Sequence, residues 1–300
     1  MDFKIKSITI LLVCMLMTIE SMPQEFLLFE LGKKKVYFPL IKVNSYRFEG
    51  PYFWKKDRTE LYKYDDSENL LSVTFQIWDD SVFSNKSQIK FIYDKNNNII
   101  EAIAFVYDHP IWKKISRSKY TYKSIDYLSN EVHEEWKDSL WVLSFKVKNY
   151  YDSNKNLIQT LTQTWENSTY VNKERSLYEY DENKKLKLFC SQIWKESKWN
   201  NKYRILIYND RNEKQYYKTW QSWKKSSWSD EEKIILKYDE NEMLHEEILS
   251  LWDDLVWVEE SKRIYNYNSD HRITEAYYLE KGTEVWSKKK KLEYIYKEIH

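Results

Sequence analysis

The sequence predicts an all-β fold: a long antiparallel meander of about 17 strands, built from nine copies of a 29-residue β-hairpin and curled or superhelical as a single sheet. Three observations predict it. Aromatic residues recur every 29 residues, turn signals arrive about every 14 residues, and apolar residues alternate at i and i+2 rather than at helical spacing. Open twisted sheets rarely exceed about ten strands without curling. A β-propeller and a partly closed barrel are the alternatives.

Each repeat is predicted to be one β-hairpin. In residues 257–267, Trp257 and Tyr267 have the same parity, which places them on one face of a strand. A Tyr-Asp-x-Asn turn follows the first strand, as at 238–241, because Asp can hydrogen-bond its own backbone and Asn tolerates a left-handed conformation. The chain returns through a second strand, as in 244–252, and a four-residue linker leads to the next tryptophan.

The N-terminal region differs from the array. Residues 1–21 carry two early lysines and an apolar run of about a dozen residues, too short for a spanning helix, which predicts a cleaved secretory signal peptide. Residues 22–53 are less regular and are predicted to be an N-terminal cap with a degenerate first strand at 41–49. Residues 54–300 form the tandem array. The signal peptide predicts a secreted or cell-surface protein.

Composition restricts the classes of partner. The chain has 26 Tyr and 14 Trp but only 3 Gly and 4 Pro, which favours a repeat array over an average globular mixture. Its 48 basic and 47 acidic residues nearly cancel, so bulk charge points to neither nucleic acid nor an anionic membrane. Once the signal peptide is removed, only Cys190 remains and no internal disulfide is possible.

Two aromatic positions in each repeat flank the linker and are predicted to face each other on paired strands. The resulting row is either a structural spine, in which each Trp buries roughly 150–250 Å², or a strip that offers flat ring faces to sugars. We favour the spine, because these repeats lack disulfides and need a large residue at every step; buried rings would remove the strip. The candidate aromatic binding strip comprises Trp136, Trp141, Trp165, Trp194, Trp199, Trp223, Trp228, Trp252 and Trp257.

A basic residue stands five positions after the second aromatic site in seven successive repeats. This candidate basic column comprises Arg117, Lys146, Arg175, Arg204, Lys233, Lys262 and Lys291. Its parity is opposite to that of tryptophan, so we expect it on the other face of the sheet. It could hold an acidic polysaccharide or nucleic acid. We favour a solvated face with cross-strand ion pairs, in which Glu131 lies opposite Lys146 and Glu247 lies opposite Lys262.

No catalytic or metal-binding constellation repeats or clusters in the sequence. His133-Glu134-Glu135 lacks the second histidine of a zincin helix. The Asp94-x-Asn96-x-Asn98 stretch resembles the start of a calcium loop but lacks the glycine and the terminal glutamate, so turn chemistry explains it. The sequence therefore predicts a protein that is not an enzyme and that uses no metal or other cofactor.

An outer-membrane barrel shares the export signal, the roughly ten-residue strands and the aromatic girdles. Charged mid-strand residues argue against it. Arg58 and Glu174 share the parity of the aromatic residue four positions earlier, Trp54 or Tyr170, while the basic column has the other parity. Neither face therefore offers an apolar band to lipid, and we predict a chain that does not span the membrane.

A recurrent phrase, Tyr-x-Tyr-Asp-x-Asn-x-x-Leu at 178–186, resembles the YD repeats of Rhs-type and teneurin-like proteins. Together with Gln-x-Trp-x-x-Ser-x-Trp at 192–199, it is more similar to tandem Trp/YD hairpin repeats in secreted Bacteroidetes proteins of unknown function. The resemblance covers 54–296 and implies spiralling β-hairpin sheets. It implies no activity, and asparagine or lysine here replaces the usual turn glycine.

Taken together, these features predict an exported, non-enzymatic repeat protein whose extended surface binds something outside the cell. Surface polysaccharide or host glycan is the most concrete candidate ligand, with no nucleic-acid partner. A purely structural surface or envelope component is the second hypothesis, and a glycan-active enzyme is the third.

Overall fold

The computed structural model describes residues 40–49, 53–124, 127–210, 215–283 and 285–297. The predicted signal peptide, 1–21, lies outside these ranges, as do residues 22–39 of the predicted cap. The strands are β1 (Leu40–Glu49), β2 (Phe53–Tyr64), β3 (Leu70–Asp79), β4 (Val82–Tyr93), β5 (Ile99–Asp108), β6 (Ile111–Ser124), β7 (Tyr127–Lys137), β8 (Leu140–Tyr151), β9 (Leu157–Glu166), β10 (Thr169–Tyr180), β11 (Leu186–Lys195), β12 (Lys198–Asp210), β13 (Gln215–Lys224), β14 (Ser227–Tyr238), β15 (Leu244–Asp253), β16 (Val256–Tyr267), β17 (Ile273–Lys281) and β18 (Trp286–Tyr296).

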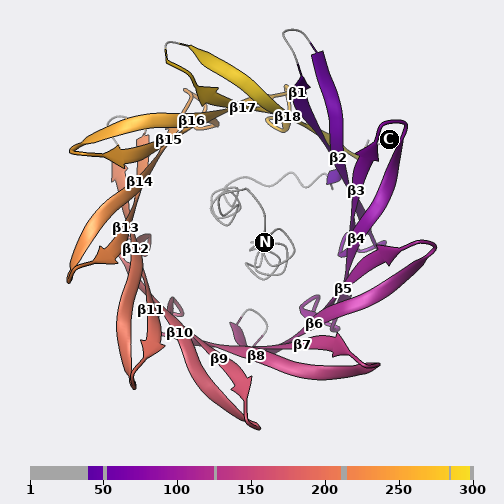
Figure 1. Cartoon of the computed structure of the whole chain (residues 1–300), viewed down its shortest axis with the longest axis vertical. Coiled ribbons are helices and arrows are strands. Elements are labelled where there is room, and N and C mark those ends of the chain that lie inside the picture. Colours follow the sequence, from indigo (N-terminus) through magenta and orange to yellow (C-terminus); the bar gives the residue numbers. More distant parts are fainter. Residues whose placement is uncertain (1–39, 50–52, 125–126, 211–214, 284, 298–300) are drawn as a thin grey trace.

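The 18 strands form one antiparallel sheet that closes into a barrel (Figure 1). Each strand pairs with its neighbours in sequence, and β1 pairs with both β2 and β18. The predicted all-β meander is confirmed, and the barrel alternative is the form it takes. Closure is complete because β1, at the predicted degenerate first strand, fills the gap between the two ends of the array. A closed sheet has no unpaired edge.

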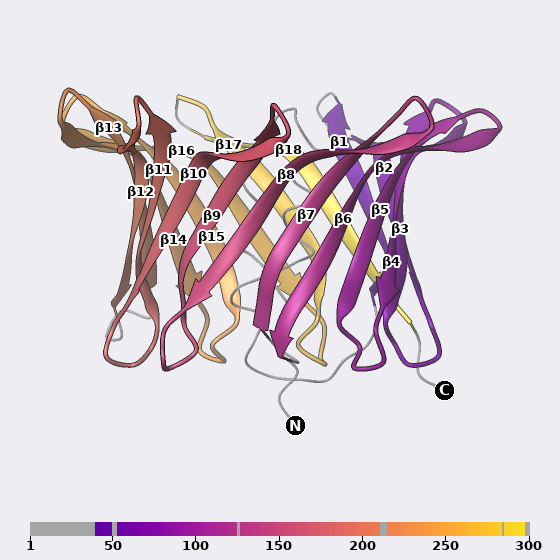
Figure 2. The ribbon, with the colours of Figure 1, turned by 90° about the horizontal axis from the view of Figure 1, so that it is seen from below.

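The two ends of the barrel differ in shape. At one end the hairpins that carry the aromatic pairs lean outward, away from the barrel axis, and at the other end the Tyr-Asp turns stay close to the wall (Figure 2). Among the described residues no helix is long and apolar enough to cross a membrane.

One β-bulge per repeat lies between the wall and each outward-leaning hairpin. In the β11–β12 pair, Gln192 lies opposite Asn201 but Ser191 lies opposite Tyr203, so Lys202 is the extra residue. A bulge bends its strand and increases the local twist, which accounts for the lean. The extra residues recur every 29 positions, at Asp57, Lys86, Ile115, Ser144, Lys173, Lys202, Glu231, Glu260 and Lys289.

The bulge also reverses side-chain parity, and this corrects the predicted faces. Two-residue steps along β11 lead from Trp194, opposite Trp199, to Cys190, opposite Arg204. Arg204 therefore lies on the tryptophan face although it stands an odd number of positions, five, after Trp199. The prediction that the basic column occupies the other face was wrong. By the same shift, Arg58 leaves the tryptophan face.

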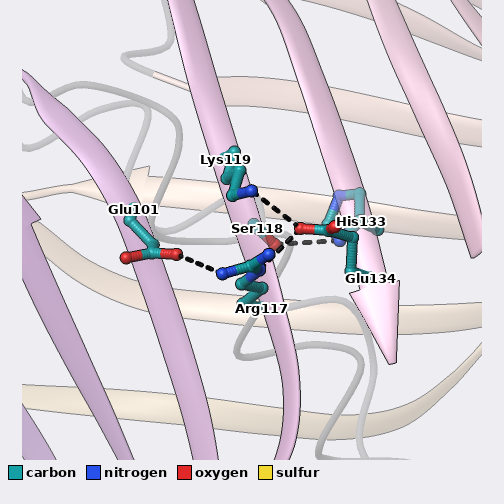
Figure 3. Close-up of polar contacts among 6 residues, drawn as sticks. All are labelled: Glu101, Arg117, Ser118, Lys119, His133 and Glu134. Carbon is teal, nitrogen blue, oxygen red and sulfur yellow. Dashed lines mark hydrogen bonds and ion pairs between the residues drawn. The ribbon is translucent and has the colours of Figure 1, made fainter. Parts of the chain in front are cut away.

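The tryptophan face is the outer surface of the barrel. Figure 3 views β5, β6 and β7 with the opposite wall behind them: Glu101, Arg117 and Glu134 lie on the near face, and Ser118 and His133 lie on the lumenal side. Glu134 precedes Trp136 by two residues on β7, so it shares that residue's face. The lumenal side contains the best-buried apolar cluster, formed by Val73, Ile89, Phe91, Ile99, Ala102 and Tyr120.

The linkers between aromatic pairs are tighter than predicted. Lys195 pairs with Lys198, so the turn consists of Glu196 and Ser197 alone, with φ of 53° and 57°. Positive φ at both central residues is the pattern of a type I′ hairpin turn. Asn-Gly or Asp-Gly is the usual signal for that turn, and neither occurs here.

The tyrosine before each Tyr-Asp turn ties neighbouring repeats together. The Tyr180 hydroxyl donates a hydrogen bond of 2.9 Å to the backbone oxygen of Leu157, the first residue of β9. The same bond, spanning 23 residues, is made by Tyr93, Tyr122, Tyr151, Tyr267 and Tyr296. Tyr208, the one column member displaced by a residue, is 55% exposed.

Candidate functional site

Aromatic pairs form a belt on the outer face of the leaning hairpins. In each pair one ring comes from the end of an odd-numbered strand and the other from the start of the next strand. Eight such pairs have ring centroids 4.7 to 4.9 Å apart: Phe48–Trp54, Trp78–Phe83, Tyr107–Trp112, Trp136–Trp141, Trp165–Tyr170, Trp194–Trp199, Trp223–Trp228 and Trp252–Trp257. In the ninth hairpin the Lys281 ammonium lies 5.6 Å from the Trp286 ring.

The rings are neither fully buried nor fully exposed. All nine residues of the candidate aromatic binding strip are partly buried, and Trp223 is the most exposed of them at 36%. Complete burial of the rings would have excluded the aromatic binding strip, and partial burial does not exclude it. Each ring therefore both packs against its partner and keeps some surface accessible to solvent.

The basic column lies directly against this belt. Each cation lies over a ring 24 positions later in the sequence, two strands further along the sheet. The pairs are Arg117–Trp141 (4.4 Å), Lys146–Tyr170 (3.8 Å), Arg175–Trp199 (4.8 Å), Arg204–Trp228 (4.6 Å), Lys233–Trp257 (5.8 Å) and Lys262–Trp286 (4.8 Å), measured from the cationic atom to the ring centroid. Lys291 lies 6.0 Å from the Tyr46 ring, where β18 pairs with β1. Aromatic rings and cations thus form one surface.

Amides hold two of these cations in place. The Arg175 Nε donates to Gln192 Oε1 at 2.7 Å, and Gln192 Nε2 donates to Asn201 Oδ1 at 2.8 Å. In the next repeat Arg204 Nε donates to Gln221 Oε1 at 2.6 Å. A guanidinium whose Nε–H is bonded in this way still has two terminal nitrogens that can donate to other acceptors.

Arg117 makes a different set of contacts. Its Nε lies 2.6 Å from Glu134 Oε2 and its Nη1 lies 3.4 Å from Glu101 Oε1, while Lys119 lies 3.2 Å from Glu134 (Figure 3). Two carboxylates thus compensate two cations. Burial is the largest single influence on the pKa of Glu134 and raises it, but the hydrogen bonds and charges of Arg117 and Lys119 together outweigh burial and lower that pKa.

The two ion pairs predicted for the basic column are not the ones formed. Lys146 lies opposite Val132, and Lys262 lies opposite Ile248, because the bulge displaces the register by one residue. Lys262 instead pairs with Glu246 at 2.9 Å.

Sequence reasoning missed a buried polar cluster on the lumenal side. Ser118 Oγ lies 2.9 Å from His133 Nδ1, His133 Nε2 lies 2.7 Å from Glu131 Oε1, and the His133 ring stacks on Phe145 at 3.8 Å. The His133–Glu131 contact is close but lacks the alignment of a directed hydrogen bond. Sequence spacing gives no signal for this contact, which follows from the strand register that places Ser118 opposite His133.

This cluster contains the residue types of a hydrolytic triad, but a substrate cannot reach its serine. Ser118 has no exposed surface, and β6 is paired on both sides at this position. Its backbone N–H groups are therefore committed to the sheet rather than available to an oxyanion.

Within the described ranges no group of three or more His, Cys, Asp or Glu is placed to hold a metal ion. Cys190 is a free, half-buried thiol, and burial raises its pKa. A thiol held in its protonated form is a weak nucleophile.

No protein-family model matches the sequence, and no curated protein matches it. Similar solved structures include a protein of unknown function from Bacteroides fragilis NCTC 9343, with 16% identity and a TM-score of 0.35 over 39% of this chain and 89% of that one. A porin-like protein from Bacteroides uniformis ATCC 8492 has 7% identity and a TM-score of 0.45, covering 86% of this chain and 98% of that one. TcdB2-TccC3-TEV has 10% identity and a TM-score of 0.40 over 77% of this chain, which spans 13% of that one. Similarity at this level is a loose likeness among β-repeat proteins.

Proposed function

We propose that this protein is a secreted, non-enzymatic barrel that binds an extended glycan along its outer aromatic belt. The observation that carries the proposal is the recurrence of the same half-exposed aromatic pair, with the same ring separation, on one face of successive hairpins. A ligand with repeating units, such as a polysaccharide, can use a repeating surface several times over, so that weak contacts add together.

The rings differ in how much face they can offer to a sugar. The second ring of each pair, as in Trp199 and Trp228, is covered in part by a cation. Among the described residues no cation lies over four of the first rings, which are Trp165, Trp194, Trp223 and Trp252. We assign sugar stacking to these four rings, which follow one another on β9, β11, β13 and β15.

An aqueous location fits the outer face. Arg117, Lys146 and Arg175 lie mid-wall on that surface, where lipid would have to solvate them at a cost of several kcal/mol each. The proposal therefore places the protein outside the cell and not in a bilayer, with export supplied by the predicted signal peptide, 1–21.

We also propose kinship with the Trp/YD hairpin repeats. The Tyr-Asp phrase has a physical role that such a family would retain: Asp181 Oδ1 accepts from the backbone nitrogens of Asn183 and Lys185, and Tyr180 bonds to the preceding repeat. These three hydrogen bonds fix the turn and the spacing between hairpins.

A glycan screen with the purified protein tests the proposal. The Trp194→Ala/Trp223→Ala double variant should lose at least about ten-fold in affinity for any glycan found, because loss of two aromatic anchors commonly costs well over 1.4 kcal/mol. The Trp54→Ala/Trp78→Ala double variant is the control, since it removes the same groups from hairpins in which Lys56 lies over Trp78. Binding that is unchanged in the Trp194→Ala/Trp223→Ala variant would refute the assignment of these rings as the binding surface.

A purely structural role is the second candidate, and one observation favours it. The belt satisfies itself internally, with rings on rings and cations on rings, as a spine would. In that case no glycan binds, and both double variants lose stability to a similar extent.

A further inference from the structure

We propose that the ligand of the outer belt is an anionic glycan with about one negative charge per disaccharide, bound along β8 to β14 by Lys146, Arg175, Arg204 and Lys233. This inference rests on the proposed function and specifies the ligand class and the arc of the barrel that binds it. Four observations support it.

Acidic partners are present at the two ends of the basic column and missing from its middle. Each column residue has two potential partner positions on the outer face, 16 residues before it and 17 residues after it. Carboxylates at these positions pair with Arg117, Lys262 and Lys291. For the four middle cations the same positions hold Asn130, Gln159, Leu188 and Tyr217 before, and Gln163, Gln192, Gln221 and Ser250 after.

The four middle cations consequently keep their charge uncompensated. Among the described residues, Lys146 contacts the Tyr170 ring, Arg175 and Arg204 contact a glutamine and a ring, and Lys233 lies over the Tyr217 and Trp257 rings, with no carboxylate in an ion pair. Burial, followed by Lys148, lowers the pKa of Lys146, as expected for a cation without an acidic neighbour.

The two arginines present an open edge. In Arg117 both Nε and Nη1 pair with carboxylates, whereas in Arg175 and Arg204 the Nε donates to a neutral glutamine. Both residues are partly buried, and the two terminal nitrogens of a guanidinium form a planar fork that suits a carboxylate or a sulfate. A guanidinium held rigidly by a ring and an amide loses little entropy on binding such an anion.

The charge of the whole arc has the same sign. Residues 140–238 contain 19 Lys and Arg against 12 Asp and Glu, whereas the entire chain has a net charge of only +1. The remainder of the barrel is therefore net acidic. A polyanion would be steered toward this arc and away from the opposite wall.

The spacing of the cations selects the kind of polyanion. Successive cations lie two strands apart, or roughly 10 Å, and the four span on the order of 29 Å. This step is close to the length of one disaccharide, so an alternating polymer would present a charge to each cation in turn. Three of the four rings assigned to sugar stacking, Trp165, Trp194 and Trp223, lie on the strands in between, and Trp252 lies on β15, next to β14.

Isosteric charge changes test the inference without removing a ring or a cation. Gln163→Glu/Gln192→Glu would give Lys146 and Arg175 the acidic partner that Glu134 gives Arg117, because Gln163 lies opposite Lys146 and Gln192 bonds to Arg175. Each of these glutamines donates to an asparagine oxygen, so the new carboxylates face no other carboxylate there. The matched control is Gln76→Glu, because Gln76 makes the same bond, to Asn85 at 2.9 Å, but Thr59 stands at its cation position. Unchanged circular dichroism establishes that each variant is folded.

The probes are hyaluronan, which carries one carboxylate per disaccharide, a neutral linear glucan of matched length, and a single-stranded oligonucleotide. We expect the wild type to bind hyaluronan at least ten-fold more tightly than the glucan, the Gln163→Glu/Gln192→Glu variant to lose most of that preference, and Gln76→Glu to retain it. Added salt should weaken the preference.

Each other outcome overturns the inference in a distinguishable way. If the glucan binds as tightly as hyaluronan and only the Trp194→Ala/Trp223→Ala variant loses binding, the anionic specificity is wrong and the proposed glycan function stands. Tighter binding of the oligonucleotide would assign the arc to nucleic acid. Absence of binding to either polysaccharide would overturn both proposals.

Discussion

The guanidinium of Arg175 lies 4.8 Å from the centre of the Trp199 ring, although β11 separates the strands that carry the two residues. This contact joins three neighbouring strands through side chains alone. Because it recurs in six repeats, it is a second system of bonds between hairpins, added to the backbone ladder.

Removing one cation should loosen its hairpin. We expect Arg204→Met to lower the free energy of unfolding by about 1–2 kcal/mol, the combined value of a cation–π contact and one hydrogen bond to Gln221. Urea denaturation followed by tryptophan fluorescence measures it. Arg204→Lys should recover part of the loss, and an unchanged midpoint in Arg204→Met would show that the contact contributes nothing.

The type I′ turns are built from residues that fit them poorly. Ser197 has a φ of 57°, so Ser197→Gly should raise the free energy of unfolding by about 0.5–1 kcal/mol through relief of backbone strain. Ser176→Gly, in the middle of β10, is the control and should lower it by a similar amount. Thermal melting of both variants compares them, and a fall in Tm for Ser197→Gly would contradict the turn assignment.

The tyrosine column should contribute through its hydroxyls. Tyr180→Phe removes the donor to Leu157 O and should cost about 0.5–1.5 kcal/mol, while the ring packing is unchanged. Tyr208→Phe serves as the control, because Tyr208 is 55% exposed and stands one residue out of the column. Equal effects of the two substitutions in chemical denaturation would argue against a role for the column.

Stability should fall in alkali. Burial, as the largest cause, raises the pKa of Tyr93, Tyr180 and Tyr267 from 10.0 to about 12. Between these two values the unfolded chain has lost protons that the folded chain retains, so the stabilisation is complete below pH 10 and is lost as pH rises toward 12. Tm measured from pH 8 to pH 12 should therefore decline in the upper half of that range. Absorbance at the phenolate band would separate tyrosine ionisation from other causes, and a flat profile would exclude the effect.

The period of the sequence was sufficient to predict the hairpins, the strand count to within one, and the aromatic pairing. It could not reveal the faces, because residues such as Lys202 and Glu231 look like ordinary strand residues, and a bulge is defined only by the partner strand. Parity is reliable only within a segment that has no bulge. A bulge lies between the second aromatic residue and the basic residue of each repeat, so the basic column was assigned to the wrong surface.

Closure was equally hard to foresee. It depends on β1, where Phe48 stands in for the first aromatic partner and lies six rather than five residues before Trp54. The pairing of β1 with β18 joins segments about 250 residues apart, and no local pattern encodes such a contact. The Ser118–His133 contact is likewise a product of register and not of spacing.

Because the first and last strands pair with each other, the number of hairpin repeats sets the circumference of the barrel, whereas strand length sets its height. Duplication of one hairpin adds two strands, so the seam stays antiparallel and the bore widens, whereas gain or loss of a single strand would leave the seam with mismatched directions. Relatives that differ by whole hairpin repeats should therefore be closed barrels of different diameter that carry the same outward-leaning aromatic hairpins.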